Sequence, residues 1–176
     1  MPDARLSTDL LLDPFGTNWR NAHVIALAAE SSRLGGLWTW DHLMGGVHQA
    51  DNVLECWTVL SALAAITRRV FIGPLTLSVA NRHPGLVAVM APTLQHVSGG
   101  RQFPGLGAGG GASSPYAACS AAFVRDVPPD PVRRRQVEEA VAVFRQVWSA
   151  QLRHAPGEYF PLGEARGSCD RIPYRR

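Results

Sequence analysis

Four apolar segments alternate with four helix-like segments along the chain, and this alternation limits the folds open to it. The apolar segments lack polar alternation, which is typical of strands in parallel sheets, and lie at residues 10–15, 37–40, 70–77 and 101–106. Helical patterns follow them at residues 18–34, 55–67, 84–98 and 130–150. Strands and helices in this order predict an α/β fold with a parallel sheet covered by helices. Two architectures fit: an open doubly wound sheet, or part of a (β/α)8 barrel.

Local signals predict where the helices begin and end. Asn18 is the expected N-cap of the first helix, and Gly35-Gly36 its stop. Pro84 fits the first turn of the third helix, whereas Pro92 inside that helix predicts a kink or an early end. Residues 108–129 read as a loop. The fourth helix is expected to bury a face made of Val137, Ala140, Val141, Phe144, Val147 and Trp148.

The composition is that of a soluble globular protein, with 46% hydrophobic and 18% charged residues. No apolar run is long enough to cross a bilayer and no secretory signal opens the chain, so we expect no membrane partner. The three cysteines, Cys56, Cys119 and Cys169, show no C-x-x-C spacing. Their odd number argues against a disulfide framework or a zinc site and predicts a cytoplasmic protein.

The net charge of +3 raises the question of a nucleic-acid partner. The run of positive residues, Arg133-Arg134-Arg135, falls in the fourth predicted helix beside Glu138 and Glu139. No aromatic residues are interleaved with it for base stacking, so this run is typical of a solvated helix face. We therefore expect no nucleic-acid binding.

A glycine-rich stretch, "GLGAGGG" at residues 105–111, follows the fourth predicted strand, and Gly105, Gly107 and Gly110 spell G-x-G-x-x-G. A dinucleotide-binding loop would open a helix directly, but "ASSPYAACSAAF" intervenes with Pro115 inside it. A P-loop is excluded because the chain contains no lysine. By itself the stretch is either a flexible turn or a loop that approaches a ligand through its backbone.

Unusual residues also end two neighbouring predicted strands. Asp41-His42 ends the second and the segment from Leu75 to Ser78 the third. Ligands of parallel α/β folds lie at these carboxyl ends, so the two segments and the glycine stretch are expected at one mouth. His48 and Asp51 follow in the loop after His42, but no further strong ligand accompanies them, so we expect no metal site.

Several segments together resemble one family, the luciferase-like monooxygenases, which include flavin-dependent and F420-dependent oxidoreductases. They are "GLWTWDHL", "GPLTLSVANRHPGLVAVMAPTLQHVSGGR", "GLGAGGG", and "VRRRQVEEAVAVFRQVWSA" followed by "GEYFPL". The resemblance covers residues 10–162 and implies a (β/α)8 barrel with FMN or the deazaflavin F420 at its mouth. It also implies hydride transfer or oxygen activation on a small organic substrate.

The family pattern assigns roles to the residues at the strand ends. It implies that His42 is catalytic beside the cofactor or substrate, and that Asp41 orients its loop. Leu75 and Thr76 would form a bulge, often with a non-proline cis peptide, behind the flavin ring. The remaining cofactor contacts would come from the backbone of Gly107, Ala108, Gly109 and Gly110. Where deazaflavin-binding relatives often carry an acidic residue after this loop, the chain has Gly110-Gly111-Ala112, so the choice between FMN and F420 stays open.

The chain is short for this fold, because a complete barrel usually needs about 250 residues. We expect a truncated, N-terminal half-barrel at residues 1–162 and a divergent, disordered tail at residues 163–176. The later strands, which usually bind the cofactor phosphate, would be absent. A half-barrel exposes two strand edges, which predicts association, as a homo-oligomer or with a complementing C-terminal half, and little activity of the chain alone. Two alternatives stay open. The first is a non-catalytic remnant or a half-barrel that needs a partner chain, and the second is a small Rossmann-type nucleotide-binding protein.

Overall fold

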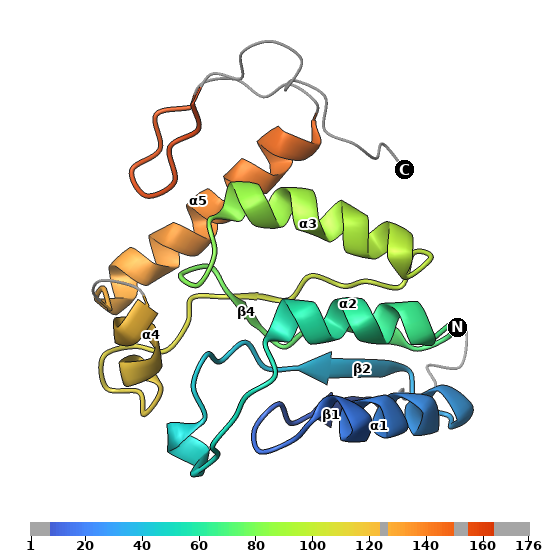
Figure 1. Ribbon diagram of the computed structural model, residues 1–176. Helices are drawn as coiled ribbons and strands as arrows, with labels where there is room; N and C mark the ends of the chain where they lie inside the picture. The colour runs from blue at the N-terminus through green and yellow to red at the C-terminus, as the bar shows by residue number, and fades with distance from the viewer. Residues whose placement is uncertain (1–7, 124–126, 150–154, 164–176) are drawn as a thin grey trace, which may run out of the picture. The chain divides into compact units, whose positions relative to one another are not determined.

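The computed structural model describes residues 8–123, 127–149 and 155–163, which form two compact units (Figure 1). The first unit runs to Thr76 and also contains Val97–Gly105, while the second contains Leu77–His96 and the chain from Leu106 onward. Of the expected tail at 163–176, all but Gly163 lies outside the described residues.

Three parallel strands form the sheet of the first unit: β1 (Leu10–Leu12), β2 (Gly36–Thr39) and β3 (Phe71–Pro74), in that order. Beyond β3, Gln102 forms a parallel bridge with Ile72, and the N–H of Phe103 donates to the carbonyl of Ile72 at 2.9 Å. The fourth predicted strand segment therefore begins beside the third. This sequential order confirms the prediction from the barrel pattern, whereas a doubly wound sheet would place the fourth strand beside the first.

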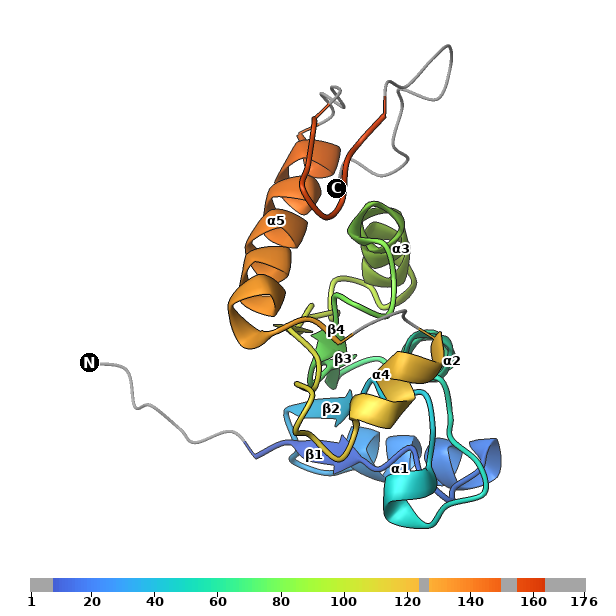
Figure 2. The same cartoon turned by 90° about the vertical axis from the view of Figure 1, so that its left-hand side faces the viewer.

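Helices α1 (Trp19–Ser31) and α2 (Cys56–Ile66) lie on one side of this sheet (Figure 2). The buried strand residues Leu12, Leu37 and Ile72 share one face of the sheet, and Leu60 and Leu63 of α2 are equally buried. Full burial of one such side chain contributes about 1.5–3 kcal/mol. This apolar layer packs α1 and α2 against β1, β2 and β3.

The predicted start of α1 is confirmed, but its predicted end is not. Asn18 is the N-cap, as predicted, and its side chain accepts a hydrogen bond from the N–H of Asn21 at 3.1 Å. The prediction that Gly35-Gly36 ends the helix is wrong, because α1 ends at Ser31 and Gly36 already belongs to β2. Ser32 caps the helix end instead, because its N–H and its hydroxyl both donate to the carbonyl of Ala29. The distant Arg69 adds donors from its guanidinium to the carbonyls of Ala29 and Glu30 in α1 and of Ser32 and Leu34 beyond it.

Arg101, the last residue of "SGGR", closes the end of α2 in the same way. Its side chain is buried and donates to the carbonyls of Ala64, Thr67 and Val70 and to the Thr67 hydroxyl, at 2.6–3.2 Å. The last carbonyls of a helix have no partner inside the helix, so a buried arginine is well placed to satisfy them. Arg101 thereby holds the segment that leads to Gln102 against the end of α2.

The second unit holds two short parallel strands, β4 (Leu77–Ser78) and β5 (Leu106–Gly107). The third predicted strand is thus divided into β3 and β4, and the fourth into the Gln102 bridge and β5. Pro104, which has no N–H to donate to a ladder, lies in the second interruption, whereas the first falls at Leu75 and Thr76, directly after the paired Pro74.

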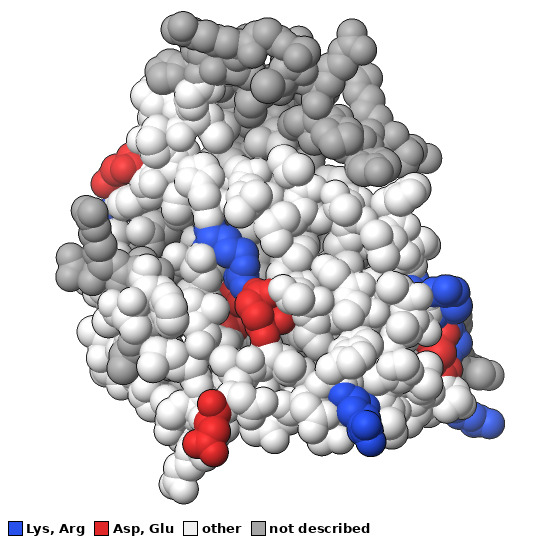
Figure 3. All heavy atoms as spheres, in the orientation of Figure 1, with Lys and Arg blue, Asp and Glu red and all other residues white. Residues whose placement is uncertain are grey.

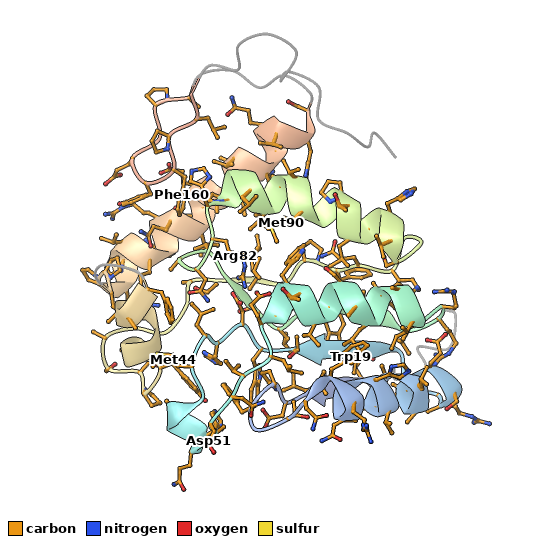
Figure 4. The ribbon with its side chains drawn as sticks, viewed as in Figure 1. Trp19, Met44, Asp51, Arg82, Met90 and Phe160 are labelled. Carbon is orange, nitrogen blue, oxygen red and sulfur yellow. The ribbon has the colours of Figure 1, made fainter. Side chains whose placement is uncertain are left out.

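Helices α3 (Pro84–Val97), α4 (Ala117–Phe123) and α5 (Asp130–Trp148) account for most of the rest of this unit. The predicted loop at 108–129 contains α4, which the alanine-rich "AACSAAF" favours. Phe160 lies beside the start of α3, where its ring meets His83 edge-on at a centroid distance of 5.8 Å (Figure 4).

The predicted early end of α3 at Pro92 is wrong, because the helix continues to Val97. Proline at position 92 has no N–H for the carbonyl of Ala88, four residues earlier. The indole Nε1 of Trp148 on α5 donates to that carbonyl at 2.8 Å and supplies the missing hydrogen bond. The prediction that Trp148 is buried is wrong, because its side chain is 46% exposed. Its indole N–H is nevertheless used, in the hydrogen bond to Ala88.

Candidate functional site

Asp41 and His42 follow β2 with only Trp40 between, so the end of a buried strand fixes their backbone. Asp41 is buried and His42 is half-buried. The ring of His42 lies 5.9 Å from that of Phe15 and 6.4 Å from that of Trp40, measured between centroids. His42, predicted to be catalytic, therefore stands in an aromatic environment next to the buried Asp41.

His48 completes this cluster of rings. Its imidazole stacks on Phe15 at a centroid distance of 4.1 Å and on Trp40 at 5.9 Å. The loop that carries Phe15 is tied to the loop after β2 in two ways. Phe15 forms an antiparallel bridge with Val53, and the N–H of Gly16 donates to the carbonyl of Asn52 at 3.1 Å. We name Phe15, Trp40, His42 and His48 the histidine–aromatic cluster.

The cluster lowers the pKa of His42 below its ordinary value. Burial is the main cause, since it disfavours the charged imidazolium, and the neighbouring His48 acts in the same direction. The carboxyl group of Asp41 acts in the opposite direction. A neutral imidazole at neutral pH can accept a proton, so the site suits general acid–base chemistry.

The loop after His42 contains the two residues weighed as metal ligands, His48 and Asp51. Asp51 is exposed in the loop that carries Met44 and the short 3-10 helix Gly46–His48 (Figure 4). Within residues 8–123, 127–149 and 155–163, no three His, Cys, Asp or Glu side chains are grouped so as to hold a metal ion. The expectation of no metal stays a prediction.

Leu75 and Thr76 come directly after β3, at the same carboxyl edge of the sheet as Asp41. The N–H of Leu75 donates to the carbonyl of Thr39, the last residue of β2, at 2.9 Å. Both side chains are exposed, and the peptide bond between them is cis, as the resemblance implied for this segment. The first unit thus brings four of the predicted site residues to one edge: Asp41, His42, Leu75 and Thr76.

The other four, Gly107 to Gly110, lie in the second unit, where Gly107 ends β5. Gly109 has a φ of +73°, and a Cβ there would stand 2.7 Å from the hydroxyl of Ser78 on β4. A Cβ on Gly110 would stand 2.8 Å from the hydroxyl of Ser114. Glycine is therefore required at both positions, by backbone conformation at the first and by close neighbours at both.

Sequence reasoning missed the residue that holds this loop. Arg133 donates to the carbonyls of Ala108 and Gly109, and its side chain is only 11% exposed. The prediction of a solvated arginine run is therefore wrong for Arg133, although it fits Arg134, which is 77% exposed. The missed signal is helical spacing, because adjacent residues of a run point to different faces of a helix.

The roles of His48 and Phe15 were missed too. His48 was considered only as a metal ligand, and Phe15 only as part of a strand. Neither residue carries a sequence signal for its contact, because the two rings meet only when the loops after β1 and β2 fold together.

Charged side chains on the face drawn in Figure 3 lie in small, separate groups of mixed sign. No large basic patch is visible among the described residues of that face. None of the helices in the described part of the chain is both long and apolar enough to cross a membrane.

A model of the luciferase-like monooxygenase family matches residues 4–174. Curated relatives include an F420-dependent glucose-6-phosphate dehydrogenase of Amycolatopsis mediterranei, 26% identical over 80% of this chain and 41% of the relative. Another is an F420-dependent hydroxymycolic acid dehydrogenase of Mycobacterium tuberculosis, 27% identical over 88% of this chain and 41% of the relative. The chain thus spans about two fifths of the length of these curated relatives.

Solved structures show the same fold. An F420-dependent secondary alcohol dehydrogenase, in complex with an F420–acetone adduct, superposes with a TM-score of 0.78 at 26% identity over 91% of this chain and 48% of that one. The oxygenating constituent of 3,6-diketocamphane monooxygenase from Pseudomonas putida, in complex with FMN, gives 0.76 at 21% identity over 91% and 44%. The fold of the chain is therefore an α/β fold with parallel strands that corresponds to part of a (β/α)8 barrel.

Proposed function

Because the chain belongs to the luciferase-like monooxygenase family, we propose that it carries the histidine side of an oxidoreductase site. The reaction proposed is transfer of a hydride between a small organic alcohol or carbonyl compound and the deazaflavin F420. FMN, with oxygen activation, is the second cofactor choice. Two matched curated relatives are F420-dependent enzymes, which supports F420 as the cofactor. FMN stays the second choice because a solved structure of similar fold is a complex with FMN.

The observation that carries this proposal is the position of His42. It follows a buried strand, stands beside a buried carboxylate, and lies among the rings of the histidine–aromatic cluster. Its lowered pKa favours the neutral imidazole, which can accept the proton of a substrate hydroxyl. Asp41 is proposed to orient the loop and the imidazole.

The glycine loop fits a planar cofactor with polar edges. In the described part of the chain, the N–H groups of Gly109, Gly110 and Gly111 donate to no protein acceptor. We propose that the glycine loop contacts the cofactor, which when bound supplies the two-electron redox chemistry. The exposed side chains of Leu75 and Thr76, in the first unit, stay predicted cofactor contacts.

His42 and Asp41 have separate proposed roles in the reaction. His42 would take the hydroxyl proton as the substrate becomes a carbonyl compound, and would return it in the reverse direction. Asp41 would hold the imidazole in place and stabilise its protonated form. The surrounding rings would limit the access of water.

The experiment is a titration of the purified chain with F420 and, separately, with FMN, followed by single-turnover assays with small secondary alcohols. His42→Ala should lower turnover by about 10²–10⁴-fold, the usual contribution of a general base. The control is His96→Ala, on the exposed end of α3. If neither cofactor binds, or if His42→Ala turns over as fast as the unmodified chain, this proposal is wrong.

A second candidate is a half-barrel module that acts only with a complementing chain or as a homo-oligomer. The observation that favours it is the sheet face opposite α1 and α2, where Leu11, Phe71 and Phe103 are 37%, 44% and 53% exposed. Phe71 and Phe103 meet edge-on at a centroid distance of 5.1 Å, so they form one apolar surface. Size-exclusion chromatography with light scattering separates the candidates, because an active monomer would contradict this one.

Three further expectations stay predictions within this proposal. They are a small-molecule substrate, the absence of nucleic-acid and membrane partners, and a cytoplasmic location. A single family domain over residues 1–162 stays a prediction as well.

A further inference from the structure

Arg133 lies on the first turns of α5 and reaches the glycine loop with both ends of its guanidinium group. Nη1 donates to the carbonyl of Ala108 at 3.3 Å and also to the carbonyl of Gly109. Nη2 donates to the carboxylate of Asp130 at 2.7 Å. A Cβ on Gly111 would stand 2.7 Å from Nη2, so the guanidinium also packs directly against that residue.

These contacts fix the side of the loop that faces α5. The carbonyls of Ala108 and Gly109 each accept a hydrogen bond from Arg133, which ties them to α5. On the other side, Gly109 approaches the Ser78 hydroxyl so closely that a Cβ would stand 2.7 Å from it. The loop is therefore held between β4 and α5, both of which belong to the second unit.

Glycines at 109, 110 and 111 would otherwise be the most mobile part of this segment. Glycine loses more conformational freedom on ordering than any other residue, and a loop must pay that entropy when it binds unless it is already ordered. A fixed arrangement of these N–H groups therefore lowers the cost of ligand binding.

We propose that Arg133 is a positioning residue that orders the glycine loop for the cofactor, with Asp130 orienting its guanidinium group. This rests on the function proposed above. Arg133 is not proposed to contact the cofactor or the substrate. Its requirement is geometric, because a planar guanidinium can bond two carbonyls and a carboxylate together, whereas a lysine ammonium is a single point charge.

The first test needs no cofactor. Backbone ¹⁵N relaxation reports the order parameter S² of the amides of Gly109, Gly110 and Gly111, where about 0.85 is rigid and below about 0.6 is flexible. Arg133→Ala should lower S² at these three glycines from the rigid to the flexible range. Arg134→Ala, which removes the neighbouring exposed arginine, is the matched control and should leave S² unchanged.

The second test measures cofactor affinity by fluorescence titration with F420 and with FMN. Arg133→Ala should raise Kd about tenfold, a factor that corresponds to 1.4 kcal/mol. Arg133→Lys should restore less than half of the lost binding free energy, because it restores the charge without the planar group whose Nη1 bonds both carbonyls while Nη2 bonds Asp130. Circular dichroism and thermal unfolding of each variant establish that it is folded.

The outcomes separate the two proposals. If the unmodified chain binds neither cofactor, the proposed function fails, while the relaxation data still decide whether Arg133 orders the loop. The positioning role is overturned if S² stays in the rigid range in Arg133→Ala, or falls equally in Arg134→Ala. It is also overturned if cofactor affinity is unchanged while S² falls, or if Arg133→Lys restores the affinity fully.

Discussion

Trp148→Phe should destabilise the second unit because Pro92 leaves a helical carbonyl without its donor. In an uninterrupted helix, the N–H of residue 92 would donate to the carbonyl of Ala88. Proline has no N–H, and the indole of Trp148 donates there instead, at 2.8 Å. Phenylalanine keeps most of the ring but not the N–H, so the carbonyl of Ala88 loses this partner.

The magnitude follows from the half-buried setting of this hydrogen bond. An acceptor left without a partner costs about 1–3 kcal/mol, and partial exposure places this case at about 1–1.5 kcal/mol. For a chain of this size, that loss lowers Tm by about 2–6 °C. Urea unfolding followed by far-UV circular dichroism measures the change, and Trp19→Phe, at an exposed tryptophan, is the control.

A double-mutant cycle with Pro92→Ala tests the cause directly. Alanine restores the N–H at position 92, so the carbonyl of Ala88 no longer needs the indole. Trp148→Phe should then cost less than about 0.5 kcal/mol, which gives a coupling energy of about 1 kcal/mol between the two positions. Equal costs of Trp148→Phe in the two backgrounds would refute this reasoning.

Three further predictions concern single residues. The lowered pKa of His42 means that the unfolded chain binds more protons below pH 6.5, so stability should fall as pH drops from about 6.5 toward the folded pKa. Thermal unfolding between pH 7.5 and about 5.5 should show a smaller fall for His42→Gln, and an equal fall would contradict the sign of the shift. Arg101→Met should lower the free energy of unfolding by about 3 kcal/mol, because it leaves buried carbonyls at the end of α2 without their donor, whereas Arg33→Met at an exposed site should change little. Gly109→Ala should weaken cofactor binding more than Gly99→Ala in a fluorescence titration, because both have positive φ but only the first would meet a neighbour within 4 Å; equal effects would assign the loss to backbone strain alone.

Local sequence signals predicted the elements that depend on neighbouring residues. The apolar runs and helical periodicity gave the order of strands and helices, and Asn18 marked the start of α1. The strand ends also pointed to Asp41, His42 and the glycine loop as a candidate site. These features need little information beyond about one turn of helix or one strand, so a single sequence carries them.

Contacts between distant segments decided the rest. Pro92 stays inside a helix because Trp148, far along the chain, supplies a donor, and the distant Arg69 donates to carbonyls at the end of α1. The ring of His48 stacks on Phe15, and Arg133 turns inward to the glycine loop while Arg134 faces solvent. Periodicity cannot reveal such pairs, because each partner looks ordinary in its own segment, and the hydrogen bond or ring contact exists only once the chain has folded.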